Sequence, residues 1–236
     1  MSKFSGLILA SNSPRRKQLL SLTGLDFQVQ PANIDEILLP GEHPWDHVLR
    51  LAQSKVREVV RIAGGSGFFL AADTIVVDAD AILGKPVDHL EAISMLKGLR
   101  GHTHQVYTGL ALCRSQLDHV VTDICIVDVP MRNFSDDEMN TYVASGDPLD
   151  KAGAYAIQHD GFQPVDNLQG CFAGVMGFPL CHIVRMFRRM EVTLSEDIPS
   201  RCQAELNYDC PIWKNILNDR ELVEDFSPSS KKKGKE

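Results

Sequence analysis

The 236-residue sequence has no pattern typical of a membrane protein or of a disulfide-stabilised protein. No apolar run approaches the roughly 18 residues of a membrane span, and the apolar part of the N-terminus is too short for a signal peptide. The six cysteines are scattered without a C-x-x-C pair, so neither a zinc knuckle nor a disulfide scaffold is indicated and we expect mostly free thiols. These absences favour a cytoplasmic protein.

Positive charge is also scarce, since 24 lysines and arginines face 31 acidic residues and the net charge is -7. This balance argues against binding of nucleic acid through the overall field, although a local basic pocket stays possible. We therefore expect a small-molecule ligand and neither a nucleic-acid polymer nor a membrane. The lysine-rich end of the chain is typical of a solubilising tail, and we expect the last dozen residues to be disordered.

Segments with strand and helix patterns alternate along the chain, which favours an α/β fold with a mixed, twisted sheet and flanking helices. Strands are predicted at 7–11 and 27–31, at 68–84 with a hairpin return, and as an antiparallel pair at 104–115 and 119–134. Helices are predicted at 14–23, 44–63, 88–99, 135–146 with a capping box, and 177–190 as an amphipathic helix. After residue 191 the periodicity weakens.

The stretch LILASNSPRRKQLLSL at 7–22 places positive charge where a helix is already positive. Ser13 and Pro14 are typical of an N-cap and a first helical position, so Arg15 and Arg16 lie in the first turn. The helix dipole and the unpaired N–H groups disfavour cations there. An anionic ligand would remove the conflict, so the pattern fits a phosphate site. It fits two solvated arginines equally well.

Lys55 lies on the apolar side of the helix expected over 44–63, on one face with Val48, Ala52 and Val59. A lysine in such a position often extends its amine to the edge of the apolar surface and has no functional role. The alternative is a cation that serves a ligand. For Lys55 taken by itself, the helix pattern favours the lysine without a functional role.

Asp73 ends the apolar run FFLAAD. Ligands of open α/β sheets bind beyond the carboxyl ends of strands, and a carboxylate carried there can bind a metal ion or activate water. The alternative is a turn-forming aspartate, the interpretation we prefer for Asp78 and Asp80. Glu36, in the loop after the second expected strand, and Lys85, in a turn fixed by proline, are further candidates.

The segment DKAGAYAIQ at 150–158 combines charged and small residues, as if its backbone approached a ligand closely. This segment, together with LASNSPRRKQLL, AADTIVV, GKPVD, GHTHQVYTGLAL, YVASGDPL and VMGFPL in this order and spacing, resembles the Maf family of nucleoside triphosphate pyrophosphatases. The resemblance covers about residues 5–190. It implies a Maf-like domain at 1–190 and a C-terminal extension at 191–236 that has no counterpart in the family pattern.

The resemblance implies an elongated fold with a central cleft, related to that of inosine triphosphatases. The implied reaction is hydrolysis of a nucleoside triphosphate between the α and β phosphates, with a divalent metal cofactor, Mg²⁺ or Mn²⁺. It assigns the following roles: Ser11, Arg15, Arg16, Lys55 and Lys85 hold the phosphates, Glu36 and Asp73 hold the metal ion and water, and Asp73 is the catalytic base.

The resemblance also implies which nucleobase the substrate carries. Arg16, Thr74 and Gln158 match the branch of the family that prefers dTTP, UTP and related pyrimidine nucleotides. The family as a whole also implies a role in removing non-standard nucleotides, and a homodimer. Two departures bear on this assignment, because His159 and Asp160 replace small or apolar residues near the expected base pocket. Their effect on specificity is open.

Two other functions stay open at this point. The first is a non-catalytic, nucleotide-binding regulator of septum formation and cell division, which an intact set of acidic and basic residues argues against. The second is a phosphate-binding scaffold whose C-terminal extension binds a partner. Pyrophosphate release from a nucleotide panel separates the enzyme from both.

Overall fold

The structure, a computed structural model, describes residues 6–64, 66–79, 81–114 and 119–218. The elements in chain order are β1 (Leu7–Leu9), α1 (Pro14–Ser21), β2 (Phe27–Val29), α2 (Pro44–Ala63), β3 (Phe68–Asp78), β4 (Ala81–Leu83), α3 (His89–Leu99), β5 (Thr103–Arg114), β6 (Val120–Pro130), α4 (Asp136–Ala144), the 3-10 turns η1 (Asp147–Asp150) and η2 (Ala152–Ala154), α5 (Phe172–Val175), α6 (Leu180–Arg189), α7 (Ile198–Leu206) and α8 (Trp213–Asn218). Among the described residues, no helix combines the length and the apolar character needed to cross a bilayer.

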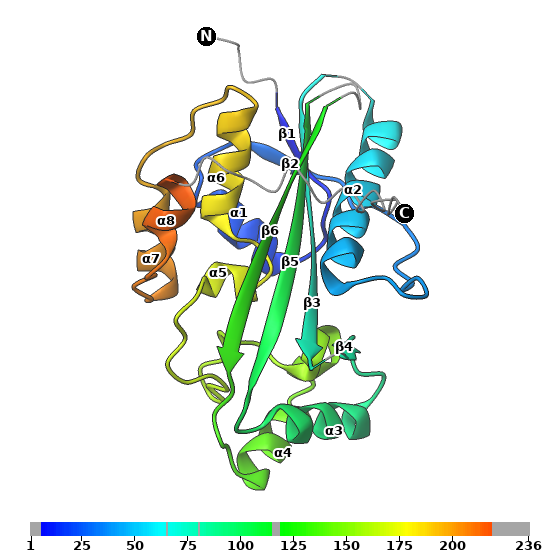
Figure 1. Cartoon of the computed structure of the whole chain (residues 1–236), viewed down its shortest axis with the longest axis vertical. Coiled ribbons are helices and arrows are strands. Elements are labelled where there is room, and N and C mark those ends of the chain that lie inside the picture. Colours follow the sequence, from blue (N-terminus) through cyan, green and yellow to red (C-terminus); the bar gives the residue numbers. More distant parts are fainter. Residues whose placement is uncertain (1–5, 65, 80, 115–118, 219–236) are drawn as a thin grey trace, which may run out of the picture.

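The strands form one mixed sheet with the order β2-β1-β3-β5-β6, and β4 pairs with β3 beside this path. β1 runs parallel to β2 and to β3, whereas β3, β5 and β6 pair antiparallel. The predicted mixed sheet and the antiparallel pair of long strands are confirmed. The molecule is elongated along these long strands, with α3 and α4 at one end (Figure 1).

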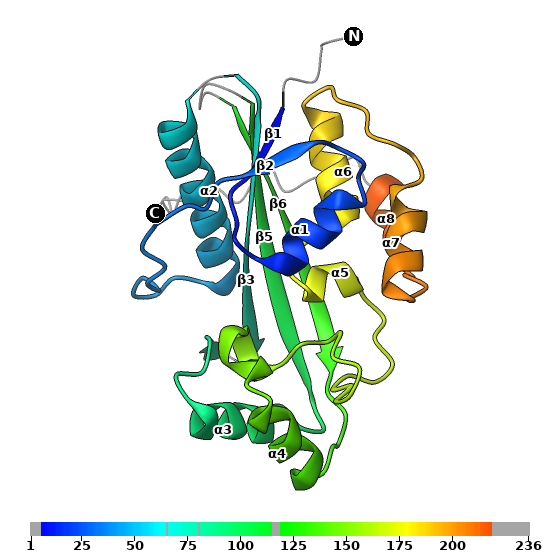
Figure 2. The ribbon, with the colours of Figure 1, turned by 180° about the vertical axis from the view of Figure 1, so that it is seen from behind.

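Successive side chains of β3 point to opposite faces of the sheet, and each face is covered by different helices. On one face, Phe69, Ala71, Ile75 and Val77 belong to apolar clusters that include residues of α2. On the other face, the even-numbered residues from Phe68 to Val76, apart from Thr74, join the larger core. α1, α5 and α6 lie on this second side of the sheet, as the view from behind shows (Figure 2). β3 is therefore the central, doubly covered strand.

One edge of β3 is only partly covered. β5 pairs with β3 along Phe68–Val77 on one edge. On the other edge β1 pairs only as far as Leu70, and β4 begins to pair at Val76. Residues 71–75 thus have a free edge just beyond the carboxyl end of β1, where the backbone groups need partners other than a strand.

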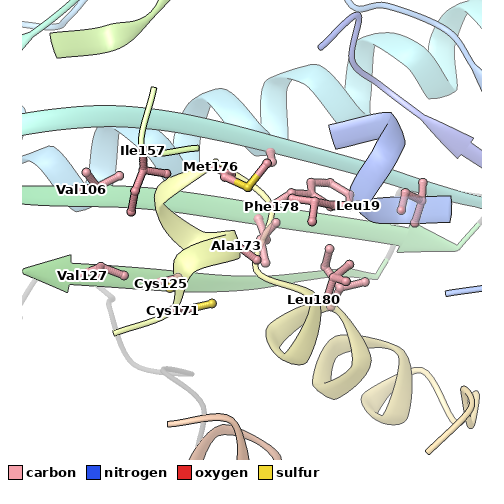
Figure 3. Close-up of a cluster of buried hydrophobic side chains, with 14 of the residues drawn as sticks. Leu19, Val106, Cys125, Val127, Ile157, Cys171, Ala173, Met176, Phe178 and Leu180 are labelled. Atoms are coloured by element: carbon pink, nitrogen blue, oxygen red, sulfur yellow. The ribbon is translucent and has the colours of Figure 1, made fainter. Parts of the chain in front are cut away.

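α5 and the turn that follows it close the larger core. Figure 3 shows Ala173, Met176 and Phe178 among the side chains of β5 and β6, with Val106 and Val127 on those strands. Because α5 is only four residues long, this packing fixes its place more than its own hydrogen bonds do. The Met176 side of the turn faces the free edge of β3 and lines the cavity described below.

The amphipathic helix predicted at 177–190 is confirmed as α6, but its polar side does not face solvent. Every residue of α6 from Leu180 to Phe187 is buried, including His182 and Arg185. The reason is that α7 and α8 of the extension pack against the side of α6 that would otherwise face solvent (Figure 1). The weak periodicity after residue 191 thus hides two short helices, in which Ile198 is fully buried.

Most other predicted elements are confirmed, with shorter ends. β1 ends at Leu9 and α1 at Ser21, while α2 keeps the predicted bounds. Ser135 and Glu138 form the predicted capping box of α4. All six cysteines are free. Asp80 and the last dozen residues lie outside the described residues.

Candidate active site

The structure brings all nine sequence-predicted site residues to one cavity of about 460 Å³. They come from six segments: the β1–α1 loop with the first turn of α1, the β2–α2 loop, α2, β3, the β4–α3 loop, and the segment after η2. The nine are Ser11, Arg15, Arg16, Glu36, Lys55, Asp73, Thr74, Lys85 and Gln158. The cavity lies at the free edge of β3.

The start of α1 reaches the cavity because β1 ends early. Ser13 is the N-cap and accepts from the N–H of Arg16, and Pro14 opens the helix, as predicted. The hydroxyl of Ser11 accepts from the N–H of Ser13 at 3.2 Å and closes the turn between strand and helix. A tight turn thus places two adjacent arginines at the cavity.

Asp73 and Lys55 form a buried ion pair. The Nζ of Lys55 donates to Asp73 Oδ1 at 2.6 Å and contacts Glu36 Oε1 at 2.7 Å. The interpretation of Lys55 as a lysine that only extends to solvent is therefore wrong. α2 comes this close to the sheet because Gly109 lies opposite Asp73 on β5, where a Cβ atom would be 2.6 Å from the backbone of Val48.

Asp73 ends the apolar run but not its strand, because β3 continues five residues further to Asp78, as the strand predicted over 68–84 requires. The rule that ligands bind at carboxyl ends still applies to β1, which runs parallel to β3 and stops beside Leu70. Asp73 is accessible to a ligand because its neighbouring strand ends, although its own strand does not.

Opposing effects act on the acidity of Glu36. Partial burial raises the pKa of its carboxyl, while the hydrogen bond and charge of Lys55 and the charges of Lys85 and Arg16 lower it. The cations outweigh the burial, and the pKa lies below its ordinary value. Glu36 therefore carries a negative charge at neutral pH.

Arg16 differs from Arg15 in its hydrogen bonds. Four of its five N–H donors are engaged by the protein: Nε donates to Gly177 O at 3.0 Å, Nη1 to Ala72 O at 2.7 Å and to Ser11 Oγ at 3.5 Å, and Nη2 to Thr74 Oγ1 at 3.1 Å. The carbonyl of Ala72 is one of the groups on the free edge of β3. Burial lowers the pKa of Arg16, and the charge of Asp73 opposes this shift.

The side chains of Arg15 and Lys85, by contrast, have no hydrogen-bond or ion-pair partner within residues 6–64, 66–79, 81–114 and 119–218, and both line the cavity. Lys85 also lowers the pKa of Glu36 through its charge, so it lies within electrostatic range of the acidic pair. These two cations keep all their donors available to an anion.

The segment 150–158 approaches β3, where the sequence suggested an approach to a ligand. Gly153, at φ +68°, would place a Cβ atom 2.9 Å from the side chain of Val76, and its N–H donates to Gly84 O at 3.0 Å. Only glycine allows this contact without strain. The contact brings the loop that carries Gln158 beside the loop that carries Lys85.

Several cavity residues escaped the sequence analysis. Lys151 is buried and pairs with Asp150 at 2.6 Å, and Tyr155 receives a hydrogen bond at its hydroxyl from, or donates one to, His104 Nε2 at 2.7 Å. The unusual composition of 150–158 pointed to the segment but to no individual role. Thr108 is missed too, because it lies on β5 behind Thr74 and outside the lining.

His159 and Asp160 do not line the cavity. His159 Nδ1 accepts from the N–H of Phe162 at 3.0 Å, and its ring packs edge-on against Tyr142. His159 thus belongs to a turn outside the cavity lining.

The acidic residues fit a divalent ion of the Mg²⁺ or Mn²⁺ kind. Among the residues that the structure describes, no group of three or more His, Cys, Asp or Glu side chains could hold a metal ion by itself. Glu36 and Asp73 offer two carboxylates at one cavity. Mg²⁺ is commonly held by one or two carboxylates together with substrate phosphates and water, so this donor set fits it when a phosphate ligand is present.

Comparison of the sequence with known proteins identifies one family. The family model described as Maf-like protein matches residues 6–190. A dTTP/UTP pyrophosphatase of Geotalea uraniireducens is 46% identical over 190 residues, which cover 80% of this chain and 97% of that protein. A protein of the same name from Geobacter sp. strain M21 is 45% identical, with 79% and 96% covered. Among solved structures, a HAM1 protein from Coxiella burnetii is 16% identical with a TM-score of 0.39, over 55% of this chain and 74% of that one.

Proposed function

Because the chain belongs to the Maf family, we propose that it hydrolyses pyrimidine nucleoside triphosphates, dTTP or UTP, to the monophosphate and pyrophosphate. The names of its relatives support a pyrophosphatase. The observation that carries the proposal is the convergence at one cavity of two carboxylates and of two cations, Arg15 and Lys85, that have no partner among the described residues. A polyanion needs the cations, and its metal ion needs the carboxylates.

The phosphates lie, in this proposal, beside Ser11, Arg15 and Lys85. Arg15 can bind phosphate oxygens with two parallel N–H groups, and the N-terminus of α1 adds its dipole. Lys55 neutralises the charge that Asp73 brings into a buried position. The site thereby concentrates positive charge where charge develops on the transferred phosphoryl group.

Asp73 is the proposed general base. It takes a proton from the water that attacks the α-phosphorus. The bond from this phosphorus to the oxygen that bridges the α and β phosphates breaks, and pyrophosphate leaves with that oxygen. Glu36 and Asp73 would hold the divalent ion, which supplies charge neutralisation at the phosphates when bound. Removal of non-standard nucleotides, a cytoplasmic location and a homodimer belong to the same proposal.

The test is a panel of dTTP, UTP, CTP and 7-methyl-GTP with Mg²⁺ or Mn²⁺, scored by pyrophosphate release. We expect turnover of dTTP or UTP, and we expect Asp73→Asn to lower kcat by about 10²–10⁴-fold without unfolding the chain. Asp78→Asn is the matched control, because Asp78 lies on the same strand but outside the cavity lining. Binding of nucleotides without turnover in every mixture would favour the regulator instead.

A further inference from the structure

A buried series of hydrogen bonds runs from the cavity along one face of the sheet, across β3 and β5, to α5. Arg16 Nη2 lies 3.1 Å from Thr74 Oγ1, which lies 3.0 Å from Thr108 Oγ1, which lies 3.0 Å from Gly174 O. Thr108 is fully buried on β5 and Thr74 lines the cavity. The series therefore connects a cavity surface to a residue that no ligand can touch.

The direction of each hydrogen bond follows from the two groups that end this series, the guanidinium of Arg16 and the carbonyl of Gly174. A guanidinium can only donate and a carbonyl can only accept, while each hydroxyl has one hydrogen. Thr108 must give its hydrogen to Gly174 O, because two bare oxygens at 3.0 Å would repel each other. Thr74 must then give its hydrogen to Thr108. The resulting order is Arg16 to Thr74 to Thr108 to Gly174.

The consequence for the cavity is that the hydroxyl of Thr74 has no hydrogen to offer. It accepts one hydrogen from Arg16, donates its own to Thr108, and keeps one lone pair. Such a group attracts an N–H and repels an anionic oxygen. Thr74 therefore cannot serve a phosphate.

The surroundings of Thr74 also fit a nucleobase. Thr74 and Asp73 are successive residues of β3 and point to opposite faces, so Thr74 lies on the face away from the ion pair. The cavity lining on that face includes Val76, Val106 and Met176. An apolar wall with one fixed acceptor suits the flat face and the polar edge of a pyrimidine.

We propose that Thr108 is a specificity-determining residue that acts through Thr74. By keeping Thr74 a pure acceptor, Thr108 makes the cavity favour pyrimidines with a ring N–H, as uracil and thymine have at N3, over cytosine, whose N3 offers a lone pair. The inference rests on the proposed function and deepens it. Thr108 does not touch the substrate, so it is a positioning residue.

The geometry leaves little freedom for Thr74 to turn away. A Cβ atom on Gly177 would lie 2.6 Å from Thr74 Oγ1, so the glycine is needed to admit the hydroxyl here. Gly174 O also accepts from the N–H of Gly177 at 3.0 Å and keeps one hydrogen bond when Thr108 is changed. Replacing Thr108 therefore frees the hydrogen of Thr74 without leaving the carbonyl bare.

The experiment compares kcat and KM for UTP and CTP in the unmodified protein, Thr108→Val and Thr108→Ser. Valine keeps the shape and removes the hydroxyl, whereas serine keeps the hydroxyl. We expect the UTP-to-CTP ratio of kcat/KM to fall at least tenfold in Thr108→Val, mainly through a higher KM for UTP, and to stay within threefold in Thr108→Ser. If the role of Thr108 were merely structural, kcat/KM would fall by the same factor for both substrates.

The inference is overturned if the ratio in Thr108→Val stays within threefold of the unmodified protein, or if Thr108→Ser changes it as much as valine does. Thr108→Ala carries the same test if the valine variant does not fold in a thermal melt. If the unmodified protein releases no pyrophosphate from UTP or CTP, the proposed function fails instead. The dissociation constants of UTP and CTP, measured in EDTA, then test the role of Thr108: the preference for UTP over CTP should fall in Thr108→Val and persist in Thr108→Ser.

Discussion

Two buried ion pairs of this protein are similar in composition and differ in how fully their carboxylates are hydrogen-bonded. Lys55 and Asp73 form one pair beside the free edge of β3, with side chains that are 10% and 9% exposed. Arg185 and Asp123 form the other between α6 and β6, with 10% and 1% exposed. Burial alone does not distinguish a functional pair from a structural one.

Asp123 is fully hydrogen-bonded. Arg185 donates from Nε and Nη2 to both carboxylate oxygens, and the N–H of Ile124 donates to Oδ1 at 2.8 Å. His182 Nδ1 lies 3.2 Å from the same oxygen. Further along, Arg185 Nη1 reaches Ile216 O of α8 at 3.4 Å, so this network joins the sheet to the extension.

Asp73 accepts from Lys55 alone, as far as the described residues go, and it faces a cavity with Arg15 and Lys85 at its rim. A carboxylate with both oxygens engaged holds elements together, whereas a carboxylate with unfilled hydrogen-bonding capacity beside a cavity points to a ligand. Replacing the cation of each ion pair by an apolar residue therefore tests directly whether the two pairs differ in role.

The largest effect is expected for Arg185→Met. The change leaves Asp123 buried without its partner, and we expect the free energy of unfolding to fall by about 3–5 kcal/mol. Urea unfolding measures it. The specific activity of the folded fraction should stay within threefold, because Arg185 does not line the cavity. A loss of activity without a loss of stability would contradict the structural role.

The reverse pattern is expected for Lys55→Met. Pyrophosphate release should fall by about 10²–10³-fold, since a preorganised cation beside the phosphates is lost. The free energy of unfolding should fall by only about 1–2 kcal/mol, because the cavity opens Asp73 to water and to neighbouring cations. Lys17→Met, at a half-buried position of α1 outside the cavity lining, is the control for the loss of one charge. A stability loss like that of Arg185→Met would make the two pairs equivalent.

A third buried group, His104, sharpens the comparison because it is held without charge. Burial lowers its pKa to about 4, the charge of Asp78 opposes this, and the charge of His102 adds to it. Between pH 6.5 and 4 the unfolded chain binds a proton that the folded chain does not, so stability falls as the pH falls, by up to about 3 kcal/mol. Urea unfolding from pH 7 to 4 measures this, and His104→Gln should flatten that part of the curve.

The smallest effect is expected at the outer end of the structural network. Arg188 is exposed and its Nη1 donates to Leu217 O of α8 at 3.1 Å. Arg188→Ala should lower the free energy of unfolding by about 1 kcal/mol, which is about 2–4 °C in Tm for a chain of this size. A shift as large as that for Arg185 would place Arg188 in the network's centre. Arg189→Ala serves as the matched control.

Much of the fold follows from local patterns. The Ser13-Pro14 helix start, the capping box at Ser135 and the antiparallel pair of long strands each depend on neighbouring residues or on period-2 alternation, and each is confirmed. The helix at 177–190 is confirmed as well, but its burial on all sides depends on α7 and α8, which lie beyond it in the chain. Local periodicity cannot indicate what will pack on a face.

For the site, the sequence by itself determined which residues can bind phosphate and metal, because charge and hydrogen-bonding capacity belong to each side chain. Only the tertiary structure decided what each one contacts. Neighbours from distant segments engage Arg16 and leave Arg15 available, and they bring Lys55 into contact with Asp73. The early end of β1 opens the edge of β3. Hydrogen bonds depend on distances and directions in space, and those are set when separate segments pack together.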